Sequence, residues 1–224
     1  MKMGDNRRGA MRILSVNVGL PRPVTWGGRA IITGIFKEPV AGRIAVRALN
    51  LDGDRQADLT VHGGREKAVY AYPAEHYAYW RAELPGVGLA HGAFGENLTT
   101  EGLREDDVHV GDRFRVGSAE LIATQPRLPC YKLAARFQRA DMVQRFLASR
   151  RTGFYFAVER EGEVAAGDAI ERVARDRVGL SIALVTRLYV GEDDDRDALR
   201  RAAQAVALPA SWRAHFLERL GAAG

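Results

Sequence analysis

The stretch QPRLPCYKL, residues 125–133, holds the only cysteine of the chain, Cys130. Two prolines, Pro126 and Pro129, fix the backbone just before the thiol, and each forces its preceding residue toward an extended conformation. A short apolar strand over 121–125 leads into the stretch, and a helical pattern follows it. The sequence therefore predicts a rigid corner between a strand and a helix, where a side chain can be aimed out of the scaffold.

Two cations flank the thiol. Arg127 precedes Cys130 and Lys132 follows it, and nearby positive charge favours the thiolate, which is the nucleophilic and metal-binding form. The alternative is an unreactive cysteine that packs as a small hydrophobic side chain. The residues alone leave both interpretations open.

Length and composition indicate a globular protein. The chain has 224 residues, of which 46% are hydrophobic and 27% charged, enough for one large domain or a main domain with a smaller appendage. A single cysteine excludes an internal disulfide framework, so we expect a cytoplasmic location. No apolar run approaches the roughly 20 residues that span a bilayer, and we expect no membrane partner. We expect residues 1–12 to form a disordered lead, with Met1 and Met11 both open as the true start.

The net charge of +5 is concentrated in the first 50 residues. A basic chain suggests nucleic-acid binding. The basic residues nevertheless occur singly among apolar ones, without a reading helix, a zinc finger or a stacking motif. A small anionic ligand fits the charge equally well, so we do not expect nucleic acid as the partner.

The first three quarters of the chain have β-type patterns. Gly27 and Gly28 separate two apolar segments and predict a hairpin, and 42–49 alternates as a strand does. Gly-Asp turns feed alternating strands over 110–116 and 166–173, which is typical of a closed β-barrel rather than of βαβ units.

Helical patterns dominate elsewhere. One helix is predicted between the two Gly-Asp strands, with apolar residues from Leu133 to Leu147 at helical spacing. After about Arg175 the pattern becomes helical three times. The acidic run before the second of these segments is expected to cap its helix. We therefore predict an α+β, mainly β fold with a barrel domain over 13–175 and a three-helix C-terminal domain over 176–224.

A second candidate binding segment contains His62, Gly63, Gly64 and Lys67. Paired glycines let the backbone approach a ligand and expose peptide N–H groups, and the ammonium of Lys67 could reach the same place. An ordinary turn is the alternative. No second His or Cys stands at zinc spacing from His62, so a structural or hydrogen-bonding role is expected for it.

Two further polar segments are ambiguous. Glu96 and Asn97 lie in a predicted short strand over 94–98, which could present a carboxylate and an amide to a polar ligand, or could be an ordinary surface strand. The loop over 50–58 lacks the spacing of a calcium-binding loop, and a simple turn is expected there.

Several of these motifs, in the same order, are those of a known family. They cover 33–39, 61–64, 67–69, 71–77, 94–98 and 125–133. With them the chain resembles the MOSC domain, in its YiiM-like branch, over nearly its whole length. The resemblance implies a β-barrel-rich domain followed by a small three-helix domain. It also implies that Cys130 matches the family cysteine proposed to bind molybdenum or to carry sulfur.

The resemblance implies a molybdenum cofactor (molybdopterin) and, as a further expectation, pyridoxal phosphate binding. A soft thiolate suits molybdenum, while cations and backbone N–H groups suit the phosphate of the cofactor. We expect Cys130 as the catalytic residue and metal ligand. The other expected cofactor contacts are Lys67, Arg127, Lys132, His62, Gly63, Gly64, Glu96 and Asn97.

The activity implied is reduction of a small N-hydroxylated substrate, such as a hydroxylaminopurine. The chain has no dinucleotide-binding glycine fingerprint and no iron–sulfur cysteine set, so a separate electron-donor reductase is expected. The main alternative is a carrier of sulfur or cofactor that acts through a Cys130 persulfide without turnover. Non-specific nucleic-acid binding is a third hypothesis, and a homodimer is left open.

Overall fold

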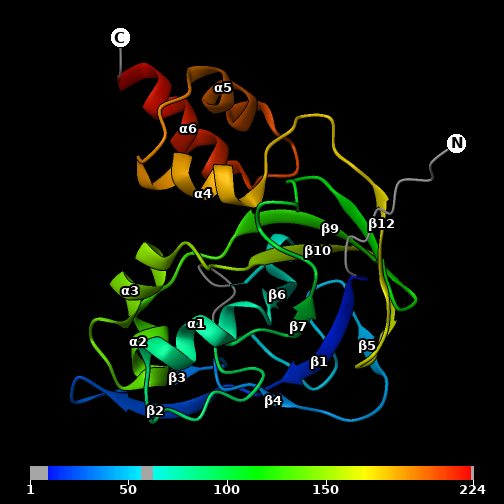
Figure 1. Ribbon diagram of the computed structural model, residues 1–224, viewed down its shortest axis with the longest axis vertical. Helices are drawn as coiled ribbons and strands as arrows, with labels where there is room; N and C mark the ends of the chain where they lie inside the picture. Colours follow the sequence, from blue (N-terminus) through cyan, green and yellow to red (C-terminus); the bar gives the residue numbers. More distant parts are fainter. Residues whose placement is uncertain (1–9, 57–62, 223–224) are drawn as a thin grey trace, which may run out of the picture.

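The computed structural model describes residues 10–56 and 63–222, and its centre is an eight-stranded sheet (Figure 1). In sheet order the strands are β12 (Ile170–Ala174), β8 (Arg113–Val116), β9 (Ala119–Pro126), β10 (Phe154–Arg160), β6 (Val69–Pro73), β7 (Leu98–Glu101), β1 (Arg12–Val18) and β4 (Glu38–Pro39). Neighbours pair antiparallel except β6 and β7, which are parallel. The α+β fold predicted from the sequence is confirmed.

The sheet does not close into the barrel that the sequence predicted. One edge of β1 pairs with β7, and its other edge is divided between two different segments. Its end, at Asn17 and Val18, pairs with β4. Its beginning bonds to the segment before β12, where Ile13 donates to the carbonyl of Asp168 (2.9 Å) and accepts from Gly167 (2.8 Å). Within the described residues, β12 makes no further pairing with β1 beyond these contacts, so the sheet curves but does not close into one continuous hydrogen-bonded ladder.

Four short strands form two additional ribbons. They are β2 (Arg22–Trp26) with β3 (Arg29–Thr33), and β5 (Ile44–Val46) with β11 (Gly162–Val164). The predicted hairpin is confirmed, and both Gly27 and Gly28 adopt positive φ (55° and 75°), as a tight hairpin turn requires. The strand predicted over 42–49 is shorter than expected.

The helices surround the sheet on two sides (Figure 1). They are η1 (Arg65–Lys67), α1 (His76–Glu83), α2 (Tyr131–Phe137), α3 (Met142–Ser149), α4 (Ile182–Val190), α5 (Arg196–Gln204) and α6 (Ala210–Ala222). The single helix predicted after Cys130 is two helices, because Gln138 takes a left-handed conformation (φ 51°) that ends α2. In the described part of the chain, none of the helices combines the length and the apolarity needed to cross a bilayer.

Two hydrophobic clusters hold these layers together. An aromatic cluster packs α1, α2 and α3 against one side of β6, where Phe94 and Phe146 each contact the rings of Tyr72 and Trp80. The larger cluster fills the space between the strands and continues into the C-terminal helices.

Side chains cap α4 and α5, and the acidic cap of α5 is the one that the sequence predicted. The hydroxyl of Ser181 accepts from the Leu184 N–H (3.1 Å) at the start of α4, and Asp195 caps α5. They are also continuous with the sheet, since α4 packs on β9 and its Leu188 is fully buried in the same cluster as Phe114. The tail therefore shares a core with the strands.

We predict that Leu188→Ala lowers the free energy of unfolding by about 2–5 kcal/mol, because it leaves a cavity in this shared core. The matched control is Leu217→Ala on α6, where the leucine is 58% exposed and a change within about 0.5 kcal/mol is expected. Urea denaturation should show one transition in both variants. Two separate transitions would mean that the helices and the sheet unfold independently.

Candidate functional site

The thiol lies at the corner that the sequence predicted. Strand β9 ends at Pro126 and helix α2 begins at Tyr131, so Cys130 occupies the N-cap position in an extended conformation (φ −131°, ψ 175°). Its carbonyl accepts from the Leu133 N–H (2.9 Å), and its half-buried side chain makes no capping bond. The sulfur is therefore held by its backbone and remains available for chemistry.

Cys130 lines a pocket of about 110 Å³ that is rich in positive charge. Five cations and one carboxylate contribute to its wall, and these are Lys37, Arg55, Lys67, Arg127, Lys132 and Asp54. Of the predicted site residues, the pocket brings together Cys130, Lys67, Arg127, Lys132 and Asn97. Such a surplus of cations favours an anionic ligand.

Arg127 is the most constrained of these cations. It is 6% exposed, and its guanidinium lies over the rings of Tyr70 (5.0 Å) and Phe146 (5.3 Å). Burial opposes its charge, but Tyr70 and Tyr155 outweigh burial and raise the pKa of Arg127. Its Nη1 has no hydrogen-bond partner in the part of the chain that the structure describes. A buried charged donor without a partner is costly, so a ligand acceptor would relieve that cost.

Lys67 and Lys132 approach the same pocket from two sides. Lys132 is buried in the first turns of α2, whereas Lys67 ends η1. Burial lowers the pKa of Lys67, and this effect is partly offset by Glu66 and Cys130.

The paired glycines support this wall without lining the pocket. The Gly64 N–H donates to Oε1 of Gln56 (3.2 Å), and Nε2 of Gln56 donates to the Lys67 carbonyl (3.0 Å). The Gly64 N–H is thus already bonded within the protein, and Gly63 and Gly64 are absent from the pocket wall. His62 lies outside the described residues.

Glu96 and Asn97 belong to a buried turn before β7 rather than to the predicted strand. Glu96 is fully buried, and its carboxylate accepts from the Tyr77 hydroxyl and from the Gly92 N–H (2.9 Å). Burial raises the pKa of Glu96, and these hydrogen bonds act in the opposite direction. Its side chain does not reach the pocket. Asn97 does, but its amide already bonds to Asp54 and to the backbone of Tyr70.

The sequence did not reveal the ion pair at the pocket wall. Lys37 pairs with Asp54, whose Oδ1 also accepts from the Gly19 N–H (3.0 Å) and whose Oδ2 accepts from Asn97 (2.8 Å). Burial lowers the pKa of Lys37, with Asp54 acting in the opposite direction. Asp54 lies in the polar loop interpreted as a simple turn, and no local pattern relates it to Lys37.

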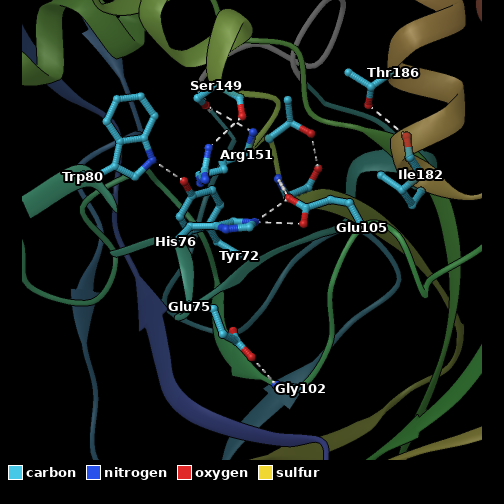
Figure 2. A network of polar contacts seen from close by, with 12 residues as sticks. Tyr72, Glu75, His76, Trp80, Gly102, Glu105, Ser149, Arg151, Ile182 and Thr186 are labelled. Carbon is cyan, nitrogen blue, oxygen red and sulfur yellow. Dashed lines mark hydrogen bonds and ion pairs between the residues drawn. The ribbon is translucent and has the colours of Figure 1, made fainter. Parts of the chain in front are cut away.

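His76 and Glu105 belong to a buried polar network (Figure 2). Hydrogen bonds through Gly153 connect Glu105 to the backbone of Arg127. Nε2 of His76 lies 2.8 Å from the Glu105 carboxylate, which accepts from the Gly153 N–H (2.8 Å). The Gly153 carbonyl in turn accepts from the Arg127 N–H (3.2 Å). Gly153 has φ +62°, and an added Cβ would lie 2.5 Å from the Ala71 carbonyl, so only glycine fits there.

Comparison with family models matches this architecture in two parts. The MOSC domain model matches residues 58–171, and the model of the YiiM-like, 3-alpha helix domain matches residues 180–222. The chain therefore belongs to the MOSC family. Its second matched region places it in the YiiM-like branch of that family.

Individual relatives agree with the assignment. YflK of Bacillus subtilis (strain 168) is 41% identical over 92% of this chain and 93% of its own length. The crystal structure of YiiM from Geobacillus stearothermophilus superposes with a TM-score of 0.78 at 39% identity, covering 94% of this chain and 99% of that one. A protein of Gibberella moniliformis named as a reductase is 33% identical over 79% of this chain, but this match covers only 32% of the fungal protein.

We predict that Asp54→Ala lowers the free energy of unfolding by about 3–5 kcal/mol, because Lys37 is left as a buried charge without its partner. The control is Asp52→Ala in the same loop, where the lost pair with Arg47 is exposed and is worth about 0–1 kcal/mol. Chemical denaturation measures both. Equal losses in the two variants would show that the Lys37–Asp54 pair has no special role in the pocket wall.

Proposed function

We propose that this MOSC-family protein binds molybdenum cofactor and reduces N-hydroxylated compounds, such as hydroxylaminopurines, with electrons from a separate reductase. The observation that carries the proposal is the convergence of the single thiol and buried cations in one pocket. Arg127 and Lys132 are both buried, and Nη1 of Arg127 has no hydrogen-bond partner among the described residues.

The chemistry of these residues fits the cofactor. A soft thiolate suits molybdenum, and guanidinium and ammonium groups suit a phosphate. Among residues 10–56 and 63–222, no group of three His, Cys, Asp or Glu side chains could hold a metal ion. A dithiolene-bearing cofactor brings its own metal ligands, so Cys130 alone would suffice from the protein. Lys67, Arg127 and Lys132 would hold the phosphate.

Reduction of an N–OH group to N–H consumes two electrons and two protons and releases water. When bound, the cofactor supplies the two-electron chemistry, whereas the protein must deliver protons. Lys37 and Lys67 line the pocket, and burial lowers the pKa of each. A lowered pKa makes an ammonium group a stronger acid. Because Lys67 is assigned to the phosphate, Lys37 is the candidate to donate a proton.

The reductase of Gibberella moniliformis supports this type of activity, since part of it resembles this chain. This chain has one cysteine and no dinucleotide-binding glycine fingerprint, so we assign electron delivery to another protein. A cytoplasmic location, where the thiol stays reduced, accompanies the proposal. Pyridoxal phosphate binding and a homodimer remain predictions.

We predict that Cys130→Ser abolishes both molybdenum retention and N-hydroxyl reduction while the protein stays folded. A hydroxyl is a harder and far less acidic ligand than a thiol. Metal analysis of protein made in cells that synthesise the cofactor, with turnover driven by a chemical reductant, tests this. Undiminished activity would end the metal-ligand assignment. Metal retention by the parent without any turnover would favour the carrier.

We further predict that Lys67→Ala and Arg127→Ala each weaken cofactor binding by about 1–3 kcal/mol, the scale of a charge-assisted hydrogen bond. Arg65→Ala serves as the matched control, because Arg65 is an exposed residue of η1 outside the pocket wall. Cofactor retained after dialysis, measured alongside thermal unfolding, gives the comparison. If both pocket variants retain cofactor like the parent, the phosphate binds elsewhere.

A further inference from the structure

Two arginines converge on one aromatic ring beside the pocket. The guanidinium carbon of Arg22, on β2, lies 4.1 Å from the centroid of the Phe36 ring, and that of Arg136, on α2, lies 4.8 Å from it. Phe36 stands between Ile35 and Lys37, which both line the pocket. Two like charges thus lie against the same ring at the pocket's edge.

Neither arginine forms an ion pair or a side-chain hydrogen bond within the described residues, and Nε of Arg136 is a buried donor without an acceptor. Burial and then Arg22 lower the pKa of Arg136, which shows that the two charges disfavour each other. Stacking on a ring uses the face of a guanidinium and leaves its in-plane N–H donors free. Those donors match the oxygen atoms of a phosphate or carboxylate.

The pair is connected to the pocket through α2. Arg136 follows Lys132 by four residues, so the two lie on the same face of the helix about 6 Å apart along its axis. Arg22 lies on β2, which packs against α2. A hydrogen bond from Gln138 to the Thr25 carbonyl (3.5 Å) also joins the hairpin to the end of this helix. A ligand seated in the pocket could therefore extend an anionic group to this pair.

We infer that Arg22 and Arg136 form an anion subsite that binds the phosphate of the substrate, so that the substrate is an N-hydroxylated nucleotide rather than the free base or nucleoside. The inference rests on the proposed function for the identity of the reacting group. The subsite itself rests on the two unpaired guanidinium groups. Arg22 is exposed, so a phosphate can reach the pair from solvent.

The test is calorimetric titration of the full-length, cofactor-loaded protein with adenosine monophosphate and with adenosine, neither of which can be reduced. The parent should bind the monophosphate at least about tenfold more tightly, on the scale of one charge-assisted contact. Arg22→Ala/Arg136→Ala should lose this preference. Arg29→Ala should keep it, because Arg29 is an exposed arginine at the other end of the same hairpin, opposite Trp26.

Equal binding of the two compounds by the parent, no binding of the monophosphate, or an unchanged preference in the double variant would each overturn the subsite. Turnover of an N-hydroxylated nucleotide and of its nucleoside separates this inference from the proposed function. Reduction of both at equal efficiency would refute the subsite and leave the reductase intact. A phosphate preference that depends on the arginine pair, without any reduction, would retain the subsite and refute the reductase.

Discussion

The site depends on one buried guanidinium. Arg127 is buried against the rings of Tyr70 and Phe146, and one of its N–H groups has no acceptor in the described part of the chain. Tyr70 and Tyr155 favour the charge, but a buried donor without an acceptor still costs free energy. An acceptor on a ligand in the adjacent pocket would remove that cost.

The surrounding structure keeps that guanidinium in place. The aromatic cluster supplies the rings. A series of hydrogen bonds from His76 through Glu105 to Gly153 holds the backbone N–H of Arg127, just after β9 ends. Also at the pocket wall, Asp54 pairs with Lys37 and accepts a hydrogen bond from Asn97. These contacts connect the segment before β4 to the turn before β7. The pocket is therefore formed by segments that lie far apart in the sequence, between Thr33 and Tyr155.

The local features of this site could be predicted from the sequence, because prolines, glycines and helix caps act on their immediate neighbours. The corner at Cys130 and the hairpin at Gly27 follow from such rules. Burial and long-range pairing do not. Glu96 was expected to face a ligand, although tertiary packing places its carboxylate in the interior. Asp54 and Lys37 are 17 residues apart, and only the folded chain brings them together. The same holds for Arg22 and Arg136 at Phe36.

Anomalous diffraction at the molybdenum absorption edge tests the central claim most directly, with crystals of protein made in cells that synthesise the cofactor. We expect a single strong peak in the pocket, adjacent to the sulfur of Cys130, with density for an anionic group near Arg127. Crystals that contain molybdenum bound away from Cys130, or protein that takes up no molybdenum while cofactor is present in the cells, would contradict it.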